Sequence, residues 1–273
     1  MRNNQDRFGA KEQAPEAPAQ TPGLKFVRPT EFVTLPSGGA YPEDHPLHGQ
    51  ETIEIYYMTA KDEDILSSEE LLKKGLAIER FMENIVVNKN IKPSAMYSGD
   101  RNAIIIAARS SAYGHLYETK VQCPACQAVN KVTFDLTNTH IFEGDLTEFD
   151  VEETETGSYI ATTPKSQIKV ELRLLTGHDE NKILKLMNAN KKEEEIVSSQ
   201  MKMYIKSVNG HAEAPYVNYF VENIPAYEAR WLRKCYETLA PNIKVSEDFE
   251  CNNCGHEQEM EVPFNTDFFW PDQ

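Results

Sequence analysis

The sequence predicts an α+β fold, in which a mixed helical domain is joined to a β element split between two parts of the chain. Apolar residues recur at helical spacing in some segments and alternate in others, which is the first sign of this class. The second sign is a pair of C-x-x-C motifs, Cys123–Cys126 and Cys251–Cys254, each flanked by alternating apolar residues. We therefore expect helices together with two short β-hairpins.

Composition favours a globular protein kept in a reducing compartment. Of the 273 residues, 40% are hydrophobic, which suits a buried core, and the formal net charge is −15. This charge disfavours general binding of nucleic acid, whose phosphates need a basic surface. The N-terminus lacks the apolar segment of a signal peptide, and the longest apolar run, residues 103–108, is too short to cross a membrane. In a reducing compartment, cysteine pairs indicate metal or redox chemistry rather than disulfides.

Changes in composition divide the chain into four segments. Residues 1–24 are rich in Pro, Ala, Gln and Glu, and we expect a flexible arm because they bury too little apolar area to offset their ordering entropy. Residues 25–136 are expected to form an α/β core that ends in the first C-x-x-C hairpin. Residues 137–244 are expected to form a mostly helical insertion, and residues 245–273 a second C-x-x-C hairpin and an aromatic tail.

Periodicity and end signals place the elements within these segments. Helices are predicted over residues 67–86, 99–114, 178–189, 192–208 and 225–241. Strands are predicted over residues 26–35, 51–58, 158–163 and 167–175, the last two as a hairpin. Ser67 and Glu70 form a capping-box pattern, and Asp100 and Gly114 are the predicted start and stop of the second helix. That second helix is apolar nearly all round, so we expect it to be buried in a core or against a partner.

The two C-x-x-C motifs match over more than their cysteines. The second motif repeats the first at an offset of 128 residues (123 to 251), and apolar residues alternate at the same positions around both. They are Tyr117, Val121, Val132, Phe134 and Leu136 in the first copy, and Val245, Phe249, Met260, Val262 and Phe264 in the second. Each copy is therefore expected to be a hairpin with a C-x-x-C turn at its tip and one apolar face.

Hairpins of this kind are the half-sites of a zinc ribbon, in which two facing turns supply the four thiolates of a tetrahedral structural Zn²⁺. The expected ligands are Cys123, Cys126, Cys251 and Cys254. Gly255 follows the second pair, where a positive φ is useful, whereas the first pair has Gln127 at that position. A redox-active pair, His256 as a substitute ligand, and a chain without metal are the alternatives.

A site of four protein ligands leaves no open coordination position, so its metal would be structural rather than catalytic. The metal would also bring the end of the chain back to its middle. The fifth cysteine, Cys235, shares a helical face with Trp231, Leu232 and Leu239, and is expected to be a buried small hydrophobic residue rather than a ligand.

No arrangement of residues indicates an enzyme. The sequence contains no Gly-rich phosphate loop, no G-x-S-x-G and no H-E-x-x-H motif. Asp44, His45 and His48 are close enough in sequence to bind a metal, and a hydrolase using them is one hypothesis. A polar loop with two surface histidines is the simpler interpretation.

Several longer stretches carry a family resemblance. They are LPSGGAYP (35–42), MTAKDEDILSS (58–68), GDRNAIIIAARSSAYGHLYE (99–118) followed by CPAC, and CNNCG followed by FFWP near the end. In sequence, order and rough spacing, these stretches resemble the baseplate hub and hub-assembly proteins of contractile-tailed, T-even-like bacteriophages. The resemblance covers about residues 26–136, whereas residues 137–244 carry little of it.

The resemblance implies a structural or assembly component of a phage tail baseplate, in its central hub region. It implies a virion location, with the host cytoplasm as the place of assembly. The implied partners are hub, wedge or tail-tube proteins, without nucleic acid, membrane or small-molecule substrate. The terminal aromatic residues Phe268, Phe269 and Trp270 could anchor such a partner or tuck onto the chain's own core, and the sequence does not favour either.

The alternative function is that of a zinc-ribbon regulatory protein that binds nucleic acid. The first hairpin has Lys120 and Lys131, which suit this role. The second hairpin is acidic, with Glu247, Asp248, Glu250, Glu257, Glu259 and Glu261. Because those carboxylates would repel phosphate, we expect contacts with proteins instead.

Overall fold

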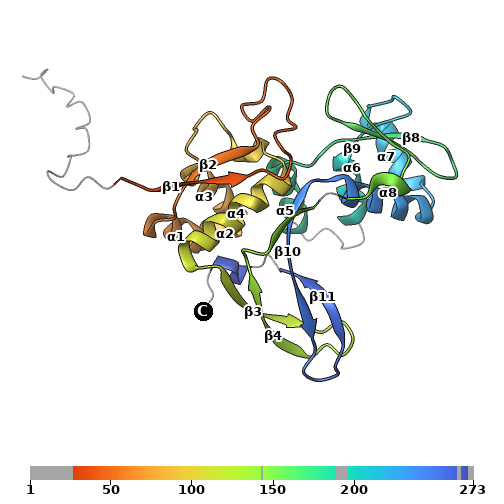
Figure 1. Ribbon diagram of the computed structural model, residues 1–273. Helices are drawn as coiled ribbons and strands as arrows, with labels where there is room; N and C mark the ends of the chain where they lie inside the picture. The colour runs from red at the N-terminus through yellow and green to blue at the C-terminus, as the bar shows by residue number, and fades with distance from the viewer. Residues whose placement is uncertain (1–26, 143, 189–195, 263–265, 270–273) are drawn as a thin grey trace, which may run out of the picture.

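Figure 1 shows the computed structural model, which describes residues 27–142, 144–188, 196–262 and 266–269. The predicted flexible arm, residues 1–24, lies outside the described residues. The fold is mixed α+β, as predicted, with helices packed beside small antiparallel sheets. No helix in the described part of the chain is long and apolar enough to cross a membrane.

The helices are α1 (Ala60–Ser67), α2 (Glu69–Lys73), α3 (Ala77–Ile85), α4 (Ser98–Tyr113), α5 (Gly177–Asn188), α6 (Ile196–Tyr204), α7 (Ala214–Asn223) and α8 (Ala226–Leu239). The strands are β1 (Thr30–Thr34), β2 (Thr52–Tyr56), β3 (Leu116–Gln122), β4 (Val129–Asp135), β5 (Thr139–Phe142), β6 (Val151–Glu153), β7 (Tyr159–Thr162), β8 (Lys169–Leu172), β9 (Ile205–Val208), β10 (Asn242–Glu250) and β11 (Glu257–Glu261). Short 3-10 turns are η1 (Pro93–Ala95), η2 (Leu146–Glu148) and η4 (Thr266–Phe269). In the described residues the strands pair as β1-β2, β3-β4, β11-β10-β5 and β6-β7-β8-β9.

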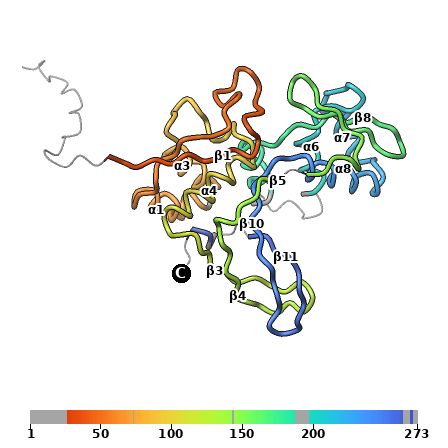
Figure 2. The backbone as a smooth tube through the Cα atoms, viewed as in Figure 1, coloured from red at the N-terminus to blue at the C-terminus, as the bar shows by residue number. Residues whose placement is uncertain are grey.

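The buried apolar residues form two clusters. The first joins β1, β2, α1, α3 and α4 to both C-x-x-C hairpins, and Ile55, Phe81, Ile104 and Tyr117 lie at its centre. The second is built from the four-stranded sheet and helices α6 to α8. Strand β10 follows α8 of the second cluster and runs on to the hairpin that projects from the body (Figure 2). It therefore connects both clusters to the cysteine turns.

The predicted helix over residues 67–86 is interrupted. Gly75 has φ +67°, a left-handed conformation that ends α2 before α3 begins, so the expectation of one continuous helix is wrong. The capping box also lies elsewhere: Thr59 and Asp62 form it at the start of α1, a helix that the sequence pattern did not reveal. A buried face on α3, which includes Phe81, packs this region into the first cluster.

Helix α4 ends as predicted but begins differently. Gly114 terminates it with φ +86°, whereas the residue at the N-cap is Tyr97 rather than Asp100. Asp100 instead lies buried in the first turn and binds the loop at residues 35–42. Its carboxylate accepts hydrogen bonds from the Ser37 amide at 2.9 Å, the Ser37 hydroxyl at 2.6 Å and the Tyr41 hydroxyl at 2.6 Å. Burial raises the pKa of Asp100, although these hydrogen bonds oppose the rise.

Two further helix predictions have different outcomes. The prediction of a helix over residues 192–208 is wrong for its last four residues, because Ile205–Val208 form strand β9. The side chains of β9 alternate between buried and more exposed positions, and the strand pairs with β8. Residues 189–195 lie outside the described residues. The helix over 225–241 is confirmed as α8, which ends before Pro241, and its Cys235 is fully buried among apolar residues. The predicted hairpin is confirmed as β7–β8, but β6, β9 and α7 were not predicted.

The aromatic residues near the C-terminus pack onto the chain itself. Phe268 meets Tyr117 edge to face at 5.0 Å between ring centroids, and Phe269 meets Phe81 in the same way at 5.5 Å. The buried guanidinium of Arg109 donates from Nε to the carbonyl of Phe268 at 3.1 Å. The alternative in which this end tucks onto its own core is therefore correct for both phenylalanines, while Trp270 lies outside the described residues.

Candidate metal centre

Four cysteine sulfurs gather at the tip of the projecting hairpins. The sulfurs of Cys123, Cys126, Cys251 and Cys254 all lie within 4.8 Å of one another. Across the two hairpins, Cys123 lies 3.8 Å from Cys254 and Cys126 lies 3.6 Å from Cys251. A tetrahedral site with metal–sulfur bonds of about 2.3 Å places its sulfurs about 3.8 Å apart. The four thiols are therefore close enough to hold one metal ion.

The two turns that carry the sulfurs have the same backbone pattern. The amide of Cys123 donates to the carbonyl of Ala128 at 2.9 Å, and the amide of Cys251 donates to that of His256 at 2.9 Å. The residue four positions after each first cysteine, Gln127 or Gly255, donates back to that cysteine's carbonyl. Gln127 has φ 62° and Gly255 has φ 66°, so the positive φ predicted for the glycine also occurs at the glutamine.

The apolar face predicted for each hairpin is confirmed. The ladder β3–β4 pairs Gln122 with Val129, and β10–β11 pairs Glu250 with Glu257, which is the same register after the offset of 128 residues. The buried members of the two faces are Tyr117, Val121, Phe134, Leu136, Val245, Phe249 and Val262. Val132 and Met260 are partly buried against the same core, and Phe264 lies outside the described residues.

Two asparagines link each turn to the sulfurs of the other. Buried Asn130, on β4, lies with its amide nitrogen 3.5 Å from the sulfur of Cys251, and its amide oxygen accepts from the backbone of Asn252 at 3.0 Å. In return, the amide of Asn253 lies 3.6 Å from the sulfur of Cys126. Such donors favour thiolates, which are the form that binds metal.

Sequence reasoning missed Asn130, although a signal was present. It is a polar residue on the inward, otherwise apolar face of β4, in register with Val132 and Phe134. A polar residue at such a position needs a hydrogen-bond partner, and here that partner is the facing cysteine turn.

The local backbone also favours a thiolate at Cys251. Its burial raises the pKa, but the amides of Asn253 and Cys254, together with the thiols of Cys126 and Cys123, donate to the sulfur and lower the pKa to about 6. Backbone amides that converge on a sulfur act in the same sense as the positive end of a helix, because they stabilise the negative charge. Cys251 is therefore suited to act as a metal ligand at neutral pH.

The other sequence candidates are engaged elsewhere. In the described part of the chain, the four cysteines are the only group of three or more Cys, His, Asp or Glu with ligand atoms this close. His45 stacks on Tyr41 with 4.2 Å between ring centroids, and Nδ1 of His48 lies 2.5 Å from the Tyr41 carbonyl. His256 lies 3.3 Å from the Gln258 side chain instead of joining the sulfurs. These contacts favour the polar-loop interpretation of residues 43–48.

The fold and the cysteine cluster define a class of protein: an α+β protein with two apolar cores and a candidate metal centre at the tip of a projecting β element. A family model described as "T4 bacteriophage base plate protein" matches residues 28–270, and the chain belongs to this family. The match also covers residues 137–244, where the sequence motifs showed little resemblance. No curated protein and no solved structure matches the chain.

Proposed function

We propose that the protein is a structural or assembly component of the central hub region of a phage tail baseplate. The observation that carries this proposal is the family match over residues 28–270. The partners would be other proteins of the tail, from the hub, the wedges or the tail tube. The protein would work through contacts rather than catalysis, first in the host cytoplasm during assembly and then in the virion.

We propose further that a structural Zn²⁺ is bound by all four thiols of the cysteine cluster. The cross-hairpin distances of 3.6 and 3.8 Å support a tetrahedral site, and thiolate sets of this kind suit zinc. Zinc would close a loop that starts at Cys123 and returns at Cys254. It would thereby hold the end of the chain against its middle.

The proposed zinc site, which joins the two C-x-x-C turns, suggests how the chain is divided into domains. Residues 25–136 and 245–273 would form one unit around the first apolar cluster, and residues 137–244 would be an insertion with the second cluster as its core. The separate membership of the two clusters supports this division.

The baseplate role is tested in the phage. A phage whose gene for this chain carries a stop codon is grown with and without the wild-type protein supplied in trans, and its tails are purified. We expect tails or baseplates to be incomplete without the protein, and we expect it to co-purify with hub, wedge or tube proteins. Complete, infectious tails in its absence would refute the role, and salt-dependent binding of the pure protein to DNA would favour the nucleic-acid alternative.

The zinc site is tested by elemental analysis of the purified chain. We expect about one zinc per wild-type chain and none in Cys251→Ser. Cys235→Ser is the matched control, because that thiol lies buried in α8, apart from the cluster. The Cys235→Ser variant should keep its zinc even if the variant is less stable than the wild type. Iron in place of zinc, or a normal zinc content in Cys251→Ser, would contradict the proposed site.

A further inference from the structure

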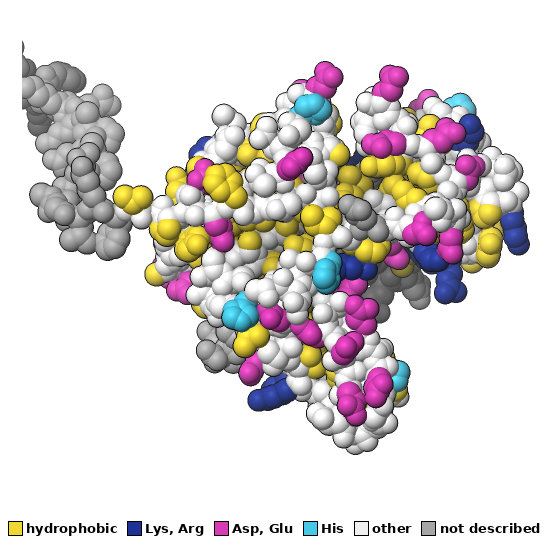
Figure 3. Space-filling model, in the orientation of Figure 1, with side chains coloured by type: hydrophobic (Ala, Val, Ile, Leu, Met, Phe, Trp, Pro, Cys, Tyr) yellow, Lys and Arg dark blue, Asp and Glu magenta, His cyan; other side chains and the backbone are white. Residues whose placement is uncertain are grey.

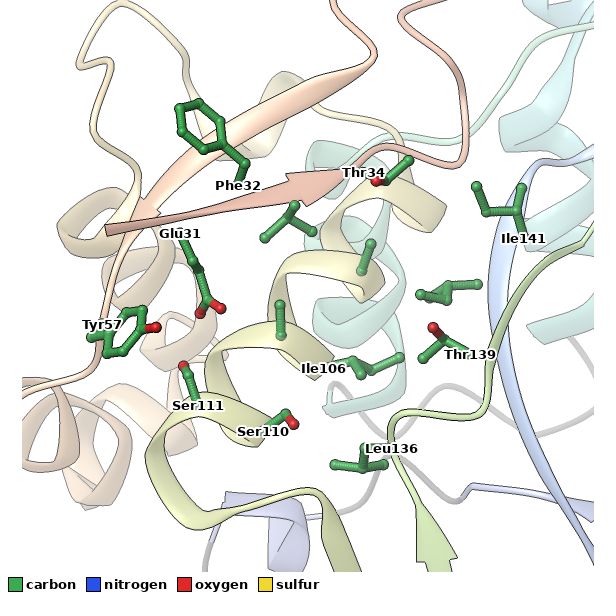
Figure 4. Close-up of a pocket in the computed structure, with 14 residues that line it drawn as sticks. Glu31, Phe32, Thr34, Tyr57, Ile106, Ser110, Ser111, Leu136, Thr139 and Ile141 are labelled. Atoms are coloured by element: carbon green, nitrogen blue, oxygen red, sulfur yellow. The ribbon is translucent and has the colours of Figure 1, made fainter. Parts of the chain in front are cut away.

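A groove lies between two sheet edges on the face of α4. Figure 4 shows it bounded by β1 on one side and by the segment of Thr139 and Ile141 on the other, and its volume is about 560 Å³. Its floor is one face of α4, formed by Ala103, Ile106, Ala107, Ser110 and Ser111. Ala103 and Ile106 are buried at the bottom of the groove, whereas Ala107, Ser110 and Ser111 are partly exposed to it.

The strand on the first side has a free edge. The amide of Leu35 donates to Glu51, and the amide of Tyr57 donates to Pro29, so the odd-numbered residues of β1 hydrogen-bond to β2. In an antiparallel pair, the alternate residues of a strand direct their N–H and C=O groups away from the partner strand. In β1 these residues are Thr30, Phe32 and Thr34, and no other described strand pairs with the edge that they form.

The strand on the second side of the groove, β5, also has a free edge. The carbonyl of Val245 accepts from the amide of Val262, so the odd-numbered residues of β10 hydrogen-bond to β11. The even-numbered residues of β10 therefore hydrogen-bond to β5. The main-chain groups of Thr139 and Ile141 consequently point away from β10, and both residues line the groove. Unpaired strand edges are the surfaces on which an extended polypeptide adds as a further strand.

Glu31 adds a charge requirement to this groove. Its side chain extends from β1 toward α4, on the side of Tyr57 and Ser111 (Figure 4). The Oε1 atom is buried and has no hydrogen-bond partner among the described residues. A carboxylate oxygen removed from water without a donor is unfavourable, so this position indicates a missing cationic or N–H group.

We propose that this groove binds an extended segment of another protein, which adds as a strand to the free edge of β1. A Lys or Arg of that segment pairs with Glu31, and its apolar side chains pack against the partly exposed Ala107 and the exposed Ile141. Phe32, which is 72% exposed on the outer face of β1, packs beside an outward-facing residue of the same segment. The net charge of −15 favours a basic partner over a second copy of this chain.

The experiment uses the full chain carrying the photo-reactive residue p-benzoylphenylalanine at Phe32, expressed during infection. Leu116, 55% exposed on β3 and outside the groove, is the matched control position. We expect position 32, and not position 116, to cross-link to one discrete segment of a tail protein that contains Lys or Arg. Cross-links only to a second copy, only to residues 1–24 of the same chain, or to no protein would overturn the proposal.

The charge pairing is tested with a synthetic peptide of the cross-linked segment. We expect Glu31→Gln to weaken peptide binding about tenfold and Glu31→Lys to weaken it more. Glu118→Lys, at an exposed position on β3, should leave binding unchanged. Exchanging the peptide's basic residue for Glu should restore binding to Glu31→Lys, and equal affinity of all variants would overturn the pairing.

This inference rests on the proposed function only in the choice of tail proteins as the source of the partner. The two proposals fail separately. If the chain is recovered in purified tails but position 32 gives no cross-link, the groove proposal is wrong and the baseplate role stands. If tails made without the chain are complete and infectious while position 32 still captures a basic segment, the baseplate role is wrong instead.

Discussion

Asn130 contacts both cysteine turns without being one of the four candidate ligands. Its amide nitrogen approaches the sulfur of Cys251, and its oxygen accepts from the backbone of Asn252. A residue in this position orients a metal ligand and stabilises its charged form, because it donates to the sulfur from a buried site. The thiols alone therefore do not define the centre.

We predict that Asn130→Ala weakens zinc binding by about 10- to 100-fold, the usual effect of removing an outer-shell partner. Thr133→Ala, at an exposed position on the same strand, is the control and should bind zinc normally. The measurement is competition with a zinc chelator of known affinity. Equal affinities of the two variants would show that Asn130 serves only to pack the hairpin.

Gln127 and Gly255 occupy equivalent positions, but only the glycine tolerates positive φ without strain. We predict that Gln127→Gly raises the free energy of unfolding by about 1 kcal/mol, because a side chain with Cβ is disfavoured in the left-handed region. Gln122→Gly, in the extended strand β3, should lower the free energy of unfolding. Chemical denaturation of both variants checks that their changes in unfolding free energy have opposite signs.

At the level of elements, α4 lies against the start of β10. Gly99, in the first turn of α4, approaches the chain so closely that an added Cβ would lie 2.0 Å from the carbonyl oxygen of Pro241. The side chain of Asn102 also donates to Asn242 at 3.1 Å. This crossing connects residues that are far apart in sequence and precedes the projecting hairpin (Figure 1).

We predict that Gly99→Ala lowers the free energy of unfolding by about 3 kcal/mol, because the backbone of β10 must move to avoid overlap. In most helices the same exchange would stabilise the protein by about 1 kcal/mol. His178→Ala, exposed in the first turn of α5, is the control and should change stability little. An unchanged unfolding midpoint in Gly99→Ala would contradict the close crossing.

On the scale of the whole molecule, the cysteine cluster joins the two hairpins that project from the body, and acidic side chains gather on that projection (Figure 3). The hairpins also share the first apolar cluster, to which Phe268 and Phe269 contribute. Disturbing the candidate metal centre should therefore affect both hairpins at once.

We predict that removing the proposed zinc with a chelator, or by lowering the pH, increases amide exchange in β3–β4 and β10–β11 together. Burial raises the pKa of Cys251, but donation from the backbone amides of Asn253 and Cys254 and from the neighbouring thiols outweighs this and lowers the pKa from 9.0 to about 6. The stabilising effect of its charge is therefore full above about pH 9 and disappears as the pH falls through about 6. Because protons compete with zinc for the thiolates, we expect zinc release on acidification. Loosening of β10–β11 alone would contradict a shared site.

Much of the candidate site could be predicted from the sequence, because its signals are local. The C-x-x-C turns and the alternation around Val121 and Phe249 specify two hairpins with one apolar face each, and the structure has both. The helix α8 was equally readable from its periodicity and from Pro241. The motifs of residues 35–118 also indicated the family that the comparison found.

Other features depend on contacts between distant segments, which local patterns do not contain. Residues 205–208 continue a helical pattern but form a strand because β8 offers a pairing edge, and Asp100 resembles an N-cap but binds Ser37 and Tyr41 across the fold. The groove of Glu31 exists only where β1, α4 and β5 meet. The sequence by itself thus determined the two cysteine turns, their apolar faces and the α+β class. Only the tertiary structure decided which strand edges no other described strand pairs with, and that Oε1 of Glu31 is buried without a hydrogen-bond partner among the described residues. Both depend on how segments that are distant in the sequence pack together.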